Sequence, residues 1–146
     1  METKYSVEDV VLMTGLSERT VRAHMAAGFM TGEKEDGKWW FSEEQLSAFF
    51  EHPAVQPGIH AKKNALVYDF MAAKPGPGRR MCVLLDLGPE ENAAVVTGAA
   101  CRAVNQAEPA APLRFAMEQQ GRGTRLILTG AAADVTAVLE ALPRET

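Results

Sequence analysis

The stretch from Tyr5 to Phe50 limits the fold of this chain more than any other segment, because helix caps and turn signals follow one another along it. Ser6 and Ser17 are the predicted N-caps of two successive helices, since a serine oxygen accepts a hydrogen bond from an amide of the first turn. Gly15 is placed to end the first helix in a left-handed conformation. The stretch therefore predicts two short helices joined by a tight turn.

A β-hairpin and a third helix are predicted next. The dipeptide Asp36-Gly37 is a strong hairpin signal, because both residues tolerate the positive φ angles of a two-residue turn. It lies between two expected short strands, near Phe29–Glu33 and Lys38–Phe41. Ser42 is the expected N-cap of the third helix.

The order and spacing of residues in this stretch are close to those of a known DNA-binding unit. The matching residues are Tyr5, Val7, Asp9, Gly15, Ser17, Thr20, Val21, Arg22, Gly28, Trp39, Phe41 and Leu46. Together they resemble the winged helix-turn-helix of the MerR-like and excisionase-like families, over about a third of the chain. In such families the second helix enters the major groove and the wing touches the DNA backbone nearby.

The resemblance implies a DNA-contacting surface on the helix at residues 17–27 and on the wing at residues 31–41. Arg19 would reach base edges, and Arg22 a phosphate. The full set of DNA-binding residues that the resemblance implies is Ser17, Arg19, Thr20, Arg22, Ala23, Lys34, Lys38 and Trp40. The expected partner is double-stranded DNA, and the expected function is transcriptional regulation.

The charge of the N-terminal part modifies this expectation. Residues 1–52 carry five basic and ten acidic side chains, a net charge of −5. Affinity for DNA comes largely from neutralising phosphates, so an acidic monomer should bind weakly. Two linked half-site contacts raise the effective concentration of the second contact, so we expect a homodimer that reads a two-fold-symmetric site.

An alternative interpretation is a protein-interaction adaptor whose winged helix no longer binds DNA strongly. MerR-type proteins usually place an aromatic residue after the helix arginine, where this chain has Ala23, and an arginine in the second wing strand. This chain has the pair Trp39-Trp40 in that strand, and exposed aromatic residues are frequent hot spots of protein interfaces.

Proline and glycine divide the chain into two predicted domains. The N-terminal domain covers residues 1–52, and a linker at 53–58 contains two prolines and a glycine. Residues 59–146 form the expected dimerisation or effector domain, whose effector, an unidentified protein or a small molecule, is left open. Its first helix is expected at Ile59–Lys74, with Lys62 and Lys63 on a solvated face.

After that helix the pattern predicts the order β-α-β-β-α. Met81–Leu87 is nearly all apolar, as in a central strand buried on both faces. Pro89 is expected at the first position of the next helix. A hairpin follows between Leu113 and Leu128, and a last helix comes after Gly130. The expected fold class is α+β, with a split β-α-β of the ferredoxin-like type in the second domain. An open sheet edge should be closed by the helix at 59–74 or by a second copy.

Other classes of function find little support in the sequence. No apolar run approaches the roughly 20 residues of a membrane helix, and the N-terminus lacks the apolar core of a signal peptide. The two cysteines, Cys82 and Cys101, have no ligand-like spacing and suit a reducing cytoplasm. No nucleophile–base pair, phosphate loop or zinc spacing is present, so we expect no enzyme, no cofactor and no metal.

Overall fold

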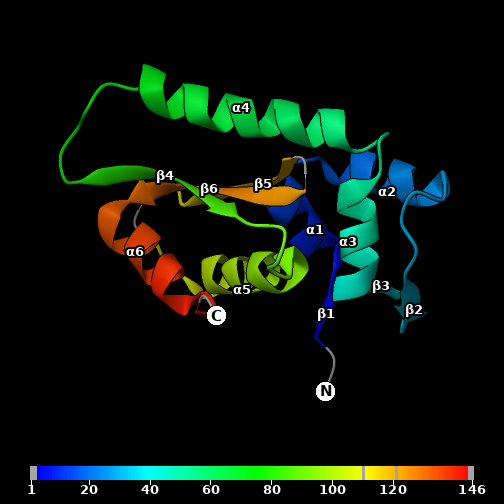
Figure 1. Ribbon diagram of the computed structural model, residues 1–146. Coiled ribbons are helices and arrows are strands. Elements are labelled where there is room, and N and C mark those ends of the chain that lie inside the picture. The colour runs from blue at the N-terminus through cyan, green and yellow to red at the C-terminus, as the bar shows by residue number, and fades with distance from the viewer. Residues whose placement is uncertain (1–2, 110, 121, 145–146) are drawn as a thin grey trace.

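The computed structural model describes residues 3–109, 111–120 and 122–144. In these residues the fold is mixed α+β, with six helices and two antiparallel three-stranded sheets (Figure 1). The N-terminal part contains β1 (Lys4–Tyr5), α1 (Val7–Thr14), α2 (Glu18–Ala26), β2 (Glu33–Glu35), β3 (Lys38–Ser42) and α3 (Glu43–Glu51). The C-terminal part contains α4 (Gln56–Ala72), β4 (Arg80–Leu87), α5 (Ala93–Gln106), β5 (Arg114–Gln120), β6 (Gly123–Ala131) and α6 (Ala132–Ala141).

The predicted helix caps of the N-terminal part are confirmed. The Ser6 hydroxyl accepts a hydrogen bond from the amide of Asp9, and the Ser6 amide donates one to the Asp9 carboxylate. Together the two bonds form a capping box. Gly15 ends α1 with φ 74°, in the left-handed region that favours glycine. Ser17 caps α2 by accepting a hydrogen bond from the amide of Thr20, and Ser42 forms a capping box with Gln45 at the start of α3.

The hairpin turn is confirmed, but its first strand is shorter than predicted. Asp36 and Gly37 both have positive φ, 52° and 78°. β2 runs from Glu33 to Glu35 and shares only Glu33 with the predicted strand. Phe29 lies before the strand, and its ring stacks on the His52 ring with centroids 4.3 Å apart. The short strand β1 pairs with the other side of β3, giving the order β1-β3-β2, a strand that the sequence pattern did not predict.

Helix α4 begins three residues earlier than predicted. It starts at Gln56 and includes Pro57 in its first turn, where a missing amide hydrogen costs nothing. The non-helical connection after α3 is correspondingly shorter than the predicted linker at 53–58. α4 lies across one face of the second sheet, mainly over β5, while α5 and α6 lie on the other face (Figure 1).

The second sheet has the order β4-β6-β5, and both outer strands are antiparallel to β6. β6 therefore lies between the two strands that α5 connects, as in a split β-α-β arrangement. The prediction that Met81–Leu87 is the central strand is wrong. β6 is central and almost wholly buried, whereas β4 is an edge strand in which Leu84 is 50% exposed.

Helix α5 begins later than predicted. Its N-cap is Asn92, whose side chain accepts a hydrogen bond from the amide of Val95, and Pro89 lies in the turn before the helix. Pro89 and Asn92 each favour a helix start at their own position. The helix begins after Asn92, because the Asn92 side chain caps its first turn. The last helix follows Gly130 as predicted, although Gly130 itself belongs to β6.

One continuous hydrophobic core joins the N-terminal and C-terminal parts. Fully buried members come from α1, α3, β5, β6 and α6, for example Val10, Phe49, Met117, Leu126 and Val135. Polar contacts reinforce this junction. Arg102 donates a hydrogen bond of 2.7 Å to the Tyr5 hydroxyl, and Asn105 donates one of 3.0 Å to Asp9.

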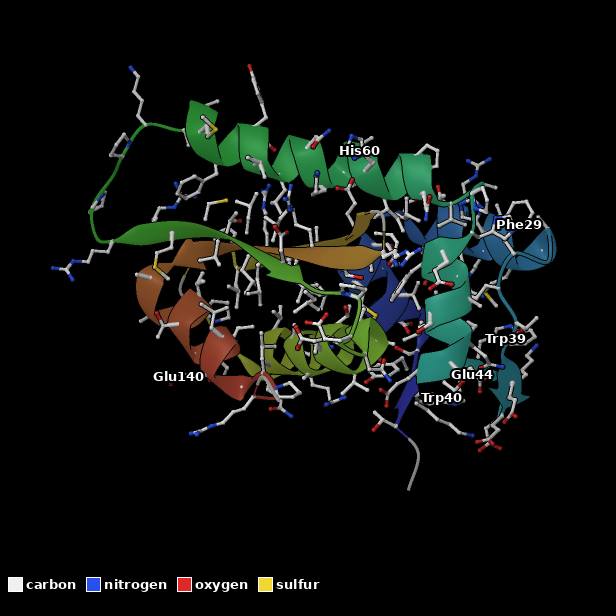
Figure 2. All side chains as sticks on the ribbon, in the orientation of Figure 1. Phe29, Trp39, Trp40, Glu44, His60 and Glu140 are labelled. Atoms are coloured by element: carbon white, nitrogen blue, oxygen red, sulfur yellow. The ribbon has the colours of Figure 1, made fainter. Side chains whose placement is uncertain are left out.

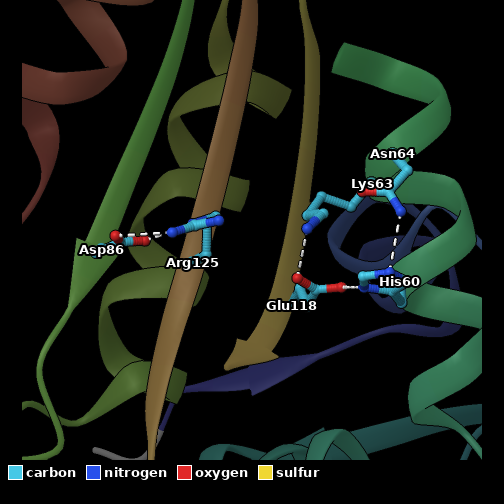
Figure 3. Close-up of polar contacts among 6 residues, drawn as sticks. All are labelled: His60, Lys63, Asn64, Asp86, Glu118 and Arg125. Carbon is cyan, nitrogen blue, oxygen red and sulfur yellow. Dashed lines mark hydrogen bonds and ion pairs between the residues drawn. The ribbon is translucent and has the colours of Figure 1, made fainter. Parts of the chain in front are cut away.

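A buried ion pair fastens α4 to the sheet (Figure 3). Lys63 Nζ lies 2.6 Å from Glu118 Oε1, and the two residues are only 6% and 3% exposed. His60 contacts the other oxygen of Glu118 and pairs in turn with Asn64. The prediction that Lys63 lies on a solvated face is therefore wrong, because β5 supplies a carboxylate below it.

Among the described residues no helix is both long and apolar enough to cross a bilayer.

Candidate nucleic-acid interface

The outer face of α2 carries the predicted contact residues. Val21 packs into the core and is fully buried, which turns Arg19, Arg22 and Ala23 outward. All three are exposed. Because residues one or two positions from a buried helical residue point away from it, this exposure follows from the helical period.

The hydroxyls of Ser17 and Thr20 are already engaged at the start of α2. Ser17 Oγ accepts a hydrogen bond of 3.1 Å from the amide of Thr20, and the two hydroxyls lie 2.9 Å apart. These contacts stabilise the helix N-terminus, where amide groups and the helix dipole also favour an anion. A phosphate would have to approach beside this cap.

Acidic side chains lie next to the basic ones. Arg22 pairs with Glu18 one helical turn earlier at 3.7 Å, with both side chains about half exposed. The pKa of Glu8, on α1, is lowered, first by a hydrogen bond to its own backbone and to a smaller extent by the charges of Lys38 and Arg22. Arg22 of α2 and Lys38 of the hairpin therefore act on one region of space, with Glu8 within it.

The hairpin presents its two lysines beside tryptophan rings. Lys34 Nζ lies 5.9 Å from the centroid of Trp39, and Lys38 Nζ lies 5.2 Å from that of Trp40. Both are at distances at which a cation is attracted to a ring face. Figure 2 shows both tryptophans at the end of the molecule remote from α6.

A surface cavity of about 460 Å³ lies between α2 and the hairpin. Its apolar lining includes Met25, Met30 and Trp39, and Arg22 also lines it. Trp40 is the next residue along β3, so its side chain lies on the opposite face of the strand. The structure thus brings Trp39, and not the predicted Trp40, next to Arg22.

Rings behind α2 hold the helix in place. His24 lies between Phe29 and Phe49, with ring centroids 5.6 and 5.8 Å away, and His52 stacks on Phe29. Burial lowers the pKa of His24, and the charge of His52 acts in the same direction. The role of these rings is therefore structural: they pack behind α2 and support its outer face.

The arrangement unites some predicted residues and separates others. Arg19, Arg22, Ala23, Lys34 and Lys38 are exposed on α2 and the hairpin, whereas Ser17 and Thr20 are used in the cap. The set of DNA-binding residues expected from the sequence left out Glu8, Met25, Met30 and Trp39. The alternation of β3 around the buried Phe41 would have assigned Trp39 to the same face as Phe41, and no local signal places Glu8 there.

The remaining residue clusters give no second site of this kind. In the part of the chain that the structure describes, no group of three or more histidine, cysteine, aspartate or glutamate side chains is arranged to hold a metal ion. Cys101 is buried against Asp9, and burial raises the pKa of its thiol to about 12, which disfavours the reactive thiolate.

Comparison with known proteins gives no relative: no family model, no curated protein and no solved structure matches this chain.

Proposed function

We propose that residues 4–51 form a winged helix-turn-helix and that the chain is a DNA-binding transcriptional regulator. The observation that supports this proposal is that α2 and the hairpin both expose basic side chains, and that Arg22 of α2 and Trp39 of the hairpin line one cavity between the two elements. In this assignment α2 enters the major groove and the hairpin is the wing along the backbone.

The residues take different parts. Arg19 reads a base edge, and Arg22, Lys34 and Lys38 neutralise phosphates, with Trp39 in place of Trp40 lining the surface between them. Because Glu18 and Glu8 already offset part of this charge, a single copy binds weakly. The regulator therefore acts as a homodimer through residues 59–146, on a site with two-fold symmetry.

Selection of bound fragments from a random duplex DNA pool tests this function, at low and at physiological salt. We expect a two-fold-symmetric motif, and we expect Arg22→Ala to weaken binding to all sequences about equally and to reduce the salt slope by about 1. Arg19→Ala instead changes the preference between sequences, with a loss of roughly 1–3 kcal/mol of discrimination at one position.

Lys74→Ala is the matched control, because it removes one exposed positive charge from the loop after α4. It should leave binding unchanged. If the Arg19 and Arg22 variants both bind as the parent does, α2 is not the helix that enters the groove.

The cavity beside Arg22 favours a second candidate, the protein-interaction adaptor. Methionine and tryptophan side chains line it, and such residues dominate many protein interfaces. In this case the DNA pool gives no enrichment even at low salt. A partner retained by the parent would then be lost with Trp39→Ala and kept with Trp40→Ala, whose ring is on the other face of β3.

A further inference from the structure

The outer edge of β4 is an open strand edge. β4 is the first strand in the order β4-β6-β5, and β6 is the one strand paired with it among the described residues. Figure 1 shows β4 along one margin of the sheet. α4 packs mainly over β5, and at the start of β4 its Phe70 ring lies 5.1 Å from the Arg80 guanidinium, so α4 touches a face of the sheet and leaves the outer edge of β4 unpaired.

This edge lacks the usual protection against pairing. The register with β6 runs without a bulge from Arg80 opposite Ala131 to Leu87 opposite Thr124. The strand contains no proline, and its centre, Met81–Leu85, is uncharged and mainly apolar. Natural proteins seldom leave a long, regular, apolar edge exposed, because it is a template for another strand.

We propose that β4 pairs with β4 of a second copy of this chain, in antiparallel register centred on Val83, so that two three-stranded sheets become one of six strands. This register sets Arg80 opposite Asp86 of the second copy, and Cys82 opposite Leu84. The strand is therefore complementary to itself in charge, which favours a second copy over an unrelated strand.

The charges on the α4 face of the sheet support this register (Figure 3). Lys63, Glu118, Arg125 and Asp86 follow one another across the sheet with alternating sign. Arg125 holds Asp86 with bonds of 2.6 and 3.0 Å, yet the Asp86 side chain remains 64% exposed at the open edge. Arg80 of the second copy continues the alternation at that point.

α4 supplies apolar cover for the same junction. Its residues Lys62, Ala65 and Asp69 line a cavity toward Leu113 and α1, on the β5 side. By helical period, Val67 and Met71 lie on the opposite side, toward β4. Met71 is 78% exposed, and a two-fold axis normal to the sheet brings both α4 helices to one face, where Met71 and Leu84 become covered.

Sedimentation velocity of the full chain without DNA tests the pairing, which rests on the dimeric form of the proposed function. We expect the parent to be a dimer. Arg80→Asp sets two acids opposite each other, and Asp86→Arg sets two bases opposite each other, so each variant alone dissociates. Mixing the two variants restores a dimer, because opposite charges then meet at both ends. Arg79→Asp, the same change next to the strand, should remain dimeric.

Cross-linking checks the register independently. Leu84→Cys brings a new thiol opposite the native Cys82 of the second copy. The Cβ atoms of such opposed residues come as close as about 4.5 Å, the upper end of the disulfide range, so oxidation by dissolved oxygen should link the two copies. Cys82→Ala in the same chain should abolish the link. Cys101 is buried and does not compete.

A monomeric parent, or an Arg80→Asp variant that dimerises as the parent does, overturns the proposal. A dimer without the Leu84→Cys link overturns it too, since the contact then lies elsewhere. The DNA selection with Arg22→Ala fails or succeeds separately, so loss of this interface and loss of the DNA-binding function are told apart.

Discussion

Tyr5 is the residue on which the junction of the two parts depends. It is 1% exposed, it belongs to β1, and its hydroxyl accepts the hydrogen bond from Arg102 of α5. Burial raises its pKa, against the opposing effect of Arg102. The ring reaches α5 because Gly98 has no side chain there.

Gly98→Ala should therefore destabilise the protein. A Cβ at this position would overlap the Tyr5 hydroxyl, and the buried ring has little room to move. Overpacking costs roughly 1–3 kcal/mol, which exceeds the gain of up to about 1 kcal/mol from replacing glycine in a helix. Urea unfolding measures the difference. Gly76→Ala, where a Cβ meets nothing, is the control. Equal stability of both variants would contradict this account.

At the scale of elements, α4 is held to the sheet by charge as well as by apolar contact. Lys63 and Glu118 are both nearly inaccessible to solvent, and a buried ion pair is costly to break because one charge remains without compensation. The helix also places His60 on the same carboxylate. The position of α4 therefore depends on a residue 55 positions later in the chain.

Glu118→Gln should lower the free energy of unfolding by about 3 kcal/mol or more, because it leaves the Lys63 ammonium buried beside a neutral group. The double variant Lys63→Met/Glu118→Leu should be less destabilised than this single variant, since it removes both charges. Equilibrium urea unfolding at neutral pH compares the three proteins. A double variant that is less stable than Glu118→Gln would contradict this account, because removing both charges would then cost more than leaving one of them buried.

At the scale of the whole molecule, the two parts share one hydrophobic core, and we expect them to behave as one folding unit. α1 and α3 pack on β5 and α5, so the N-terminal part buries its inner surface against the C-terminal part. The chain changes direction near residues 53–58, where proline and glycine indicate a boundary. Helices before this point still contact strands and helices after it.

Unfolding should accordingly be a single transition. Both tryptophans of the chain, Trp39 and Trp40, lie in the N-terminal part, whereas the longest helices, α4 and α5, lie in the C-terminal part. Tryptophan fluorescence and backbone ellipticity should give the same denaturation midpoint. Gly98→Ala, a change in α5, should shift both midpoints together. Two separate midpoints would instead describe two independent domains.

Local signals in the sequence determined the elements of the N-terminal part. Ser6, Gly15, Ser17, the pair Asp36-Gly37 and Ser42 each act within a few residues, through a cap or a positive φ, so their effects could be read without knowing the fold. The exposure of Arg19, Arg22 and Ala23 followed from the helical period around Val21. That part of the candidate interface was predictable.

The tertiary structure alone decided what depends on distant partners. Whether an apolar strand is central or at an edge depends on which strands pair with it, so β6 and not β4 became central. Lys63 is buried because Glu118 lies beneath it, and Glu8 lies near Arg22 and Lys38 because three elements meet there. Such contacts join residues far apart in sequence, and no short-range pattern records them.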